Sequence, residues 1–136
     1  MSMAGLQAEP DIASWVFGGI VIRCTTTEGF ASYDDLGQRF VFCPAPEDKS
    51  STYAIDVERR GIGAPEVLQQ ELAAVGDEFY RRWTELEVLA KLYDVPVLAL
   101  VKEPPFREGV LLQRVDTEKH WIVLGKRDPQ EESRIR

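Results

Sequence analysis

The stretch YAIDVERRGIGAPEVLQQEL, residues 53–72, passes from the pattern of a strand to the pattern of a helix. Tyr53, Ile55 and Val57 stand at every second position, which is the period of a strand with one buried face. Two glycines follow in a loop, and Pro65 suits the first turn of a helix, where its missing N–H is not needed. The stretch therefore predicts a strand, a glycine loop and a helix, in that order.

The helix that begins at Pro65 is expected to be long. Apolar residues recur at spacings of three and four from Leu68 to Tyr93, and oppositely charged pairs stand four residues apart on the other face. Gly76 interrupts this pattern, so that it either separates two helices or lies within one. We favour a continuous helix over residues 65–93, because a helical glycine costs only about 1 kcal/mol relative to alanine and both flanks are periodic.

Strand patterns precede this segment. The run WVFGGIVIRC, residues 15–24, is β-branched and aromatic, which predicts a first strand with a bulge at its glycine pair. Residues 30–33 and RFVFC, residues 39–43, predict two further strands, and the Asp-Asp-Leu-Gly sequence at 34–37 is typical of the turn between them. We expect a three-stranded meander.

Strand patterns also follow the helix. VPVLALV, residues 95–101, is apolar almost throughout, as is typical of a central strand covered on both faces. Residues 110–115 and 121–126 predict a hairpin around residues 116–120. The order β-β-β-β-α-β-β-β indicates an α+β fold, with a mostly antiparallel sheet and one long helix packed across one face.

The length of 136 residues fits one domain, which we place at residues 13–126, between flexible ends at 1–12 and 127–136. The formal net charge of -7 argues against nucleic-acid binding. The chain has no apolar run of about 20 residues and no signal-peptide pattern, so we expect a cytoplasmic protein without a membrane segment. The single histidine excludes a histidine-rich metal site, and we predict neither a metal nor a cofactor.

The glycine loop holds the candidate for anion binding, because a strand leads through two arginines and a Gly-x-Gly sequence into a helix N-terminus. The residues are Arg59, Arg60, Gly61 and Gly63. The motif is incomplete, since Pro65 removes one backbone donor and no Gly-Lys-Ser/Thr sequence follows. The alternative is an ordinary loop between a strand and a helix.

Other reactive groups suggest weaker sites. His120 is the only available partner for a nucleophilic thiol at Cys24 or Cys43, but a histidine in a turn is more often half-exposed and without a chemical role. Four carboxylates offer acid-base chemistry or a magnesium site, against the simpler interpretation that they are solvated: Asp34, Asp35, Asp56 and Glu58. We assign no catalytic residue and lean toward a function other than catalysis.

The second half of the long helix is apolar around more of its circumference than one sheet contact uses, which predicts a second covered surface. The expected interface residues are Trp83, Leu86, Leu89, Leu92 and Tyr93. The sequence therefore favours a homodimeric protein-binding module of the adaptor or chaperone kind. The alternative is a protein, or a small enzyme, that binds a small molecule, phosphate or a nucleotide at the arginine and glycine loop.

Overall fold

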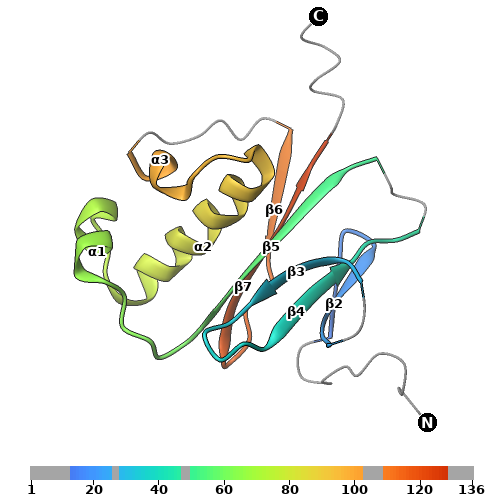
Figure 1. The fold of residues 1–136 in the computed structure, drawn as a ribbon, viewed down its shortest axis with the longest axis horizontal. Helices are drawn as coiled ribbons and strands as arrows, with labels where there is room; N and C mark the ends of the chain where they lie inside the picture. Colours follow the sequence, from blue (N-terminus) through green and yellow to red (C-terminus); the bar gives the residue numbers. More distant parts are fainter. Residues whose placement is uncertain (1–12, 26–27, 47–49, 103–108, 129–136) are drawn as a thin grey trace, which may run out of the picture.

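The computed structural model describes residues 13–25, 28–46, 50–102 and 109–128. It confirms an α+β fold, in which two antiparallel sheets and a group of helices form successive layers (Figure 1). The strands and helices are β1 (Ser14–Val16), β2 (Gly19–Arg23), β3 (Phe30–Tyr33), β4 (Arg39–Cys43), β5 (Thr52–Arg59), α1 (Glu66–Leu72), α2 (Gly76–Tyr93), α3 (Val97–Lys102), β6 (Val110–Arg114) and β7 (His120–Arg127). The expected flexible ends, apart from Arg127 and Asp128, lie outside the described residues.

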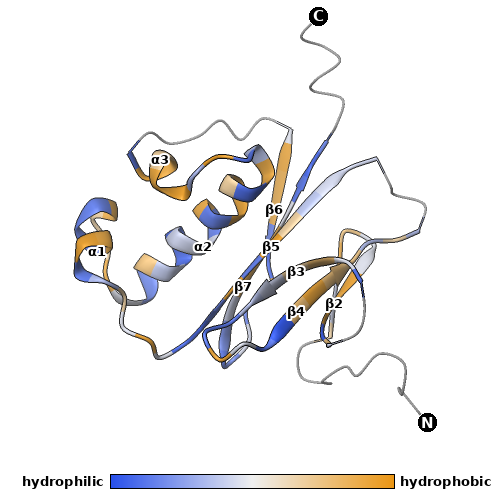
Figure 2. Cartoon of the chain, viewed as in Figure 1, coloured by the Kyte–Doolittle hydropathy of each residue, from blue (hydrophilic) through white to orange (hydrophobic). Residues whose placement is uncertain are grey.

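The first sheet has the strand order β1-β2-β4-β3, so the predicted meander is wrong. β4 lies in the middle and pairs with β2 on one side, where Val21 faces Phe42, and with β3 on the other. The predicted single first strand is also two strands, because Phe17 and Gly18 have φ values of 52° and 80° and turn the chain back on itself. Figure 2 shows that β4, the middle strand, is largely apolar.

The second sheet has the order β5-β7-β6 and forms the middle layer of the molecule. The predicted hairpin of β6 and β7 is confirmed. One face of this sheet packs on the first sheet through Tyr53, Ile55 and Val57, and the other face packs on α2. β5 is therefore buried on both faces, and the prediction of a single buried face is wrong because the residues between the apolar ones lie under a helix. Asp56, at 5% exposure, is one of them.

Two helices replace the continuous helix predicted over residues 65–93. Ala73 adopts a left-handed conformation with φ of 55° and ends α1, and α2 begins at Gly76. The break allows Leu72 to join a buried cluster with Phe79. A continuous helix would be about 43 Å long, whereas a compact domain of this size is only roughly 35 Å across, so folding back buries more of the apolar surface.

The apolar run at residues 95–101 is helical where a central strand was predicted, and forms α3. Val97, Leu100 and Val101 lie against the cluster formed by α1 and α2, whereas Leu98 is 55% exposed. A short apolar run fits either structure by periodicity alone. β7 occupies the centre of the second sheet, where the sequence had suggested residues 95–101. Residues of α3 instead cover apolar side chains of α1 and α2. No helix in the described part of the chain is long and apolar enough to cross a membrane.

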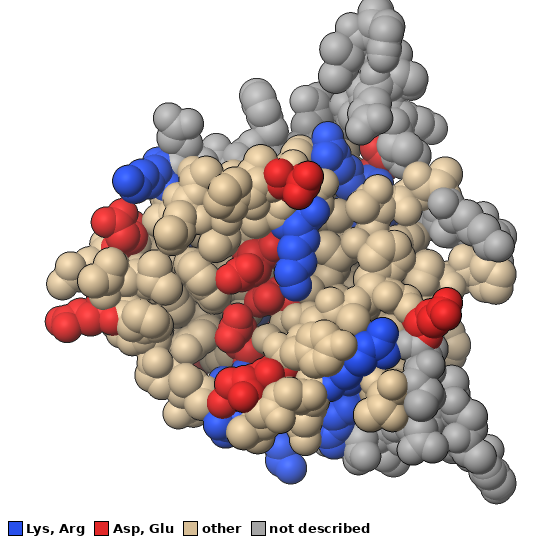
Figure 3. Space-filling view, in the orientation of Figure 1, with Lys and Arg blue, Asp and Glu red and all other residues tan. Residues whose placement is uncertain are grey.

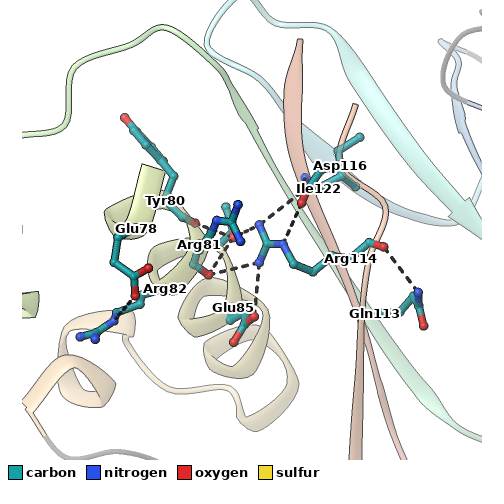
Figure 4. Close-up of polar contacts among 10 residues, drawn as sticks. Glu78, Tyr80, Arg81, Arg82, Glu85, Gln113, Arg114, Asp116 and Ile122 are labelled. Carbon is teal, nitrogen blue, oxygen red and sulfur yellow. Dashed lines mark hydrogen bonds and ion pairs between the residues drawn. The ribbon is translucent and has the colours of Figure 1, made fainter. Parts of the chain in front are cut away.

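Arg114 on β6 joins the second sheet to α2 (Figure 4). Its Nη2 donates to Thr84 Oγ1 at 3.1 Å, and its Nη1 donates to the Arg81 carbonyl at 3.2 Å. Asp116 accepts a hydrogen bond from Arg114 Nε at 2.9 Å. The arginine thus satisfies polar groups on both elements and helps to set the position of the helix across the sheet.

Candidate functional site

The glycine loop between β5 and α1 lies beside the start of β7. Arg60 donates its backbone N–H to the Lys119 carbonyl at 2.9 Å, and its guanidinium lies 3.8 Å from the centre of the Trp121 ring. Gly61 has φ of 89°, a conformation that favours glycine and that turns the chain out of the strand. Gly61, Gly63 and Arg60 line one pocket together with Trp121. The structure therefore brings three of the four predicted anion-binding residues together.

Arg59 points to a different partner. It makes two hydrogen bonds to the carboxylate of Asp35, at 2.8 and 2.9 Å. These bonds lower the pKa of Asp35 and raise the pKa of Arg59. The charge of Arg59 is thereby balanced within the chain, and it contributes less to anion binding than the sequence suggested.

The N-terminus of α1 lacks the features of an anion site. The helix has only seven residues, Pro65 precedes it without a side-chain cap, and Glu66 places a negative charge in its first turn. The dipole of so short a helix is small, and the carboxylate already complements it. Any anion binding by the glycine loop must therefore depend on side chains rather than on the helix terminus.

The side chains that can bind an anion surround a pocket of about 450 Å³, the basic pocket, where the ends of β2, β5 and β7 meet the turn before β4. Its basic lining residues are Arg23, Arg59, Arg60, Lys119 and His120. Gln38 adds an amide and holds Arg23 in place by accepting a hydrogen bond from its Nη1 at 3.0 Å. Glu118 is the one carboxylate among those lining residues that the structure describes.

His120 is buried, at 3% exposure, and the expectation of a half-exposed turn residue is wrong. Its Nε2 lies 3.0 Å from Asp34 Oδ2, and Asp34 Oδ1 accepts hydrogen bonds from the backbone N–H groups of Leu36 and Gln38, both at 2.9 Å. Asp34 itself is 6% exposed, so it is not the solvated carboxylate that the turn sequence suggested. The pair fixes the imidazole at the inner wall of the basic pocket.

The two thiols show no sign of nucleophilic activation. Cys24 is 1% exposed. Cys43 donates to the Glu28 carbonyl at 3.6 Å, and burial, with a contribution from Cys24, raises its pKa. A reactive cysteine needs a lowered pKa. The described contacts of the His120 imidazole ring are with Asp34 and the Phe40 ring, so the structure offers no support for a Cys-His pair.

The remaining carboxylates lie on the helix-facing side of β5. Burial, followed by the charge of Glu87, raises the pKa of Glu58 to about 7. Burial, followed by the charge of Glu58, raises the pKa of Asp56 well above its usual value. Lys91 on α2 lies 3.7 Å from Asp56 Oδ1 and partly offsets these effects. Figure 3 shows that acidic side chains also gather in a row down the middle of the molecular surface seen in that view. Within the described residues, no group of three or more acidic, histidine or cysteine side chains could hold a metal ion.

The predicted interface residues are mostly inside the chain. Leu86, Leu89 and Leu92 are 8%, 0% and 5% exposed, because α2 packs on the second sheet and on the other helices. Trp83 stacks on Phe79 at 5.7 Å between ring centres. Tyr93 lies under the Arg127 guanidinium at 4.4 Å. The apolar circumference of the helix is thus explained by contacts within one chain.

Comparisons with protein-family models, with curated proteins and with solved structures found no match. The site is therefore interpreted from its own geometry. Sequence reasoning found the glycine loop but did not place Lys119 and Trp121 beside it, because the contact between Arg60 and Lys119 joins segments that are distant in the sequence. The sequence placed Lys119 in the turn of the hairpin and Trp121 at the start of its second strand, and neither position indicates which loop lies next to it.

Proposed function

We propose that the protein binds a small anionic ligand, a phosphate or a phosphate monoester, in the basic pocket. The observation that supports this proposal most directly is the state of Arg60. Its Nε is buried without a hydrogen-bond partner, and its guanidinium contacts the Trp121 ring but no carboxylate among the described residues. A buried donor without an acceptor is costly, and the side chain of Arg60 lines the basic pocket, where a ligand oxygen can accept hydrogen bonds from the guanidinium.

The local charge also favours an anion. Arg59 is balanced by Asp35, and the charges of Arg60 and Lys119 together exceed the single negative charge of Glu118, so the described lining keeps an excess of positive charge. This excess stands against a net charge of -7 for the whole chain. The field at the pocket attracts a small anion, whereas the rest of the surface repels an extended polyanion such as nucleic acid.

The lining of the basic pocket supports binding rather than covalent chemistry. Among the described residues that line it, there is no serine, threonine, cysteine or tyrosine that could act as a nucleophile. His120 is held by Asp34 in a buried position and serves as a fixed polar wall. We therefore propose a ligand-binding protein and assign no catalytic residue.

Isothermal titration calorimetry with inorganic phosphate, at constant ionic strength, tests this function. We expect binding that weakens about tenfold or more, a loss of roughly 1.4 kcal/mol, in Arg60→Gln and in Lys119→Gln. The matched control is Lys102→Gln, which removes the same charge from α3 outside the lining of the pocket. Absence of binding at millimolar phosphate, or equal binding by all four proteins, would contradict the proposal.

The homodimer, a protein partner and a cytoplasmic location stay predictions from the sequence. Of the side chains that α2 was expected to offer to a second chain, Leu86, Leu89 and Leu92 are buried, whereas Trp83 and Tyr93 are partly exposed. Exposed apolar residues on the helical side include Val67, Val75 and Leu98. A contact with a second chain can be tested at these exposed residues.

A further inference from the structure

Arg60 lines a second pocket as well as the basic pocket. This second pocket, the aromatic pocket, has a volume of about 260 Å³ and lies between the glycine loop and the first turns of α2. Tyr80 and Trp121 supply its rings. Arg60 is common to the linings of the two pockets, so the pockets are neighbours and the same side chain borders both.

The groups in the aromatic pocket suit a flat ring. The Tyr80 and Trp121 rings are stacked, with an angle of 10° between their planes and 6.4 Å between their centres. The Arg60 guanidinium lies 3.8 Å from the centre of the Trp121 ring. Aromatic bases stack on tyrosine rings and on arginine guanidinium planes, while the arginine N–H groups remain able to bind a phosphate.

The glycine loop leaves room for such a ring. A Cβ placed on Gly61 or on Gly63 would have no other heavy atom within 4 Å. The loop therefore presents bare backbone to open space, as is common where a ligand approaches the main chain closely.

The charges give the ligand an orientation. Asp77 lines the aromatic pocket and repels a second anionic group there. The basic pocket carries the excess positive charge. An anion is therefore directed to the basic pocket, and the uncharged end of the same molecule is left for the aromatic pocket.

We infer that the ligand is a phosphate monoester whose other end is a flat, uncharged ring, as in a mononucleotide, with Arg60 contacting both ends. This inference rests on the proposed function, since the basic pocket must hold the phosphate. It adds the class of molecule attached to that phosphate.

Calorimetric titration of the full chain with AMP and with ribose 5-phosphate tests the inference, because these two probes share the sugar and the phosphate and differ in the base. We expect AMP to bind at least about tenfold more tightly. Gly63→Leu should remove most of this preference by filling the aromatic pocket, since Gly63 lies outside the left-handed region and its side chain meets open space. Lys102→Gln should preserve the preference.

The outcomes separate the two proposals. Equal affinity for AMP and ribose 5-phosphate would overturn the ring inference and leave phosphate binding intact. A preference for AMP that persists in Gly63→Leu would also overturn the inference, because the base would then lie elsewhere. If neither AMP nor ribose 5-phosphate binds, the proposed function itself is refuted. The comparison of probes uses the unaltered protein, so it holds even if the variant folds poorly.

Discussion

His120 Nε2 lies 3.0 Å from Asp34 Oδ2, and the two residues, 86 positions apart in the chain, are both buried. The contact joins the start of β7 to the turn that follows β3, and therefore holds the second sheet against the first. His120 also lines the basic pocket. His120 therefore contributes both to the packing of the two sheets and to the proposed binding site.

Replacement of Asp34 should destabilise the protein strongly. Asp34→Ala removes the acceptor for His120 and for two backbone N–H groups, and leaves buried donors without partners. We expect the free energy of unfolding to fall by about 3 kcal/mol. Urea denaturation measures this change. The neighbouring Asp35→Ala is the control, because its exposed pair with Arg59 contributes little. Equal effects of the two substitutions would contradict the importance of burial at Asp34.

Gly125 should resist even a small side chain. A Cβ at this position of β7 would clash with Val88 and lie 2.9 Å from Leu92 Cδ1, both on α2. We expect Gly125→Ala to lower the free energy of unfolding by about 1–3 kcal/mol through overpacking. Gly63→Ala is the matched control, since its Cβ meets open space, and it should leave stability unchanged or raise it by up to about 1 kcal/mol. A neutral Gly125→Ala would show that α2 can move away from the sheet.

The buried carboxylates should make stability depend on pH. Glu58 has a pKa of about 7 in the folded protein and 4.5 as its ordinary value. Between these values the folded state binds more protons than the unfolded state, so the contribution of Glu58 to the free energy of unfolding decreases as the pH rises from about 4.5 to about 7. Asp56, whose pKa is also raised, adds in the same direction.

The variant Glu58→Gln isolates this effect. It removes the charge and keeps a hydrogen-bond acceptor, so it should gain stability relative to the unaltered protein between pH 5 and pH 8. Denaturation curves at the two pH values give the difference directly. A stability difference that is the same at both pH values would mean that Glu58 ionises in the folded state as it does in water.

The oligomeric state and the role of α2 can be tested together. Leu89 is fully buried, so Leu89→Asp should abolish cooperative unfolding, a loss of about 4 kcal/mol or more, rather than produce a folded monomer. Leu98→Asp, at a residue 55% exposed, should leave the fold intact. Light scattering coupled to size exclusion, over a hundredfold range of concentration, then reports whether a dimer exists and whether Leu98 contributes to it. A well-folded Leu89→Asp protein would contradict the described packing of the helix.

The sequence pattern predicted correctly those features that are formed by residues close together in the chain. The turn chemistry at residues 34–37 correctly located the turn between β3 and β4, and the strand-like runs at residues 110–115 and 121–126 correctly located the hairpin of β6 and β7. The prediction paired β2 with β3, whereas β2 pairs with β4. The residues of a strand do not indicate which of two possible neighbours it pairs with. The apolar residues 95–101 were assigned to a strand because a run of seven residues has too few periods to distinguish a helix.

The site was predictable only in part, for a related reason. The arginine and glycine loop is a local signal, and the structure places Arg60, Gly61 and Gly63 at one pocket. The burial of His120 against Asp34 is set by the packing of two sheets, and no residue near either of them in sequence reports it. The redirection of Arg59 to Asp35 is likewise a tertiary contact.

The central position of β7 has a consequence for synthesis on the ribosome. β7 is the last described strand, and it pairs with β5 over eight residues and with β6 on its other side. A nascent chain that has emerged only as far as α3 has all three helices but lacks the strand that fills the middle of the second sheet. The first sheet and the helices therefore have no completed layer between them until residue 127 leaves the exit tunnel. The core can therefore close only after β7 has emerged, and until then the edge of β5 that pairs with β7 has no partner strand.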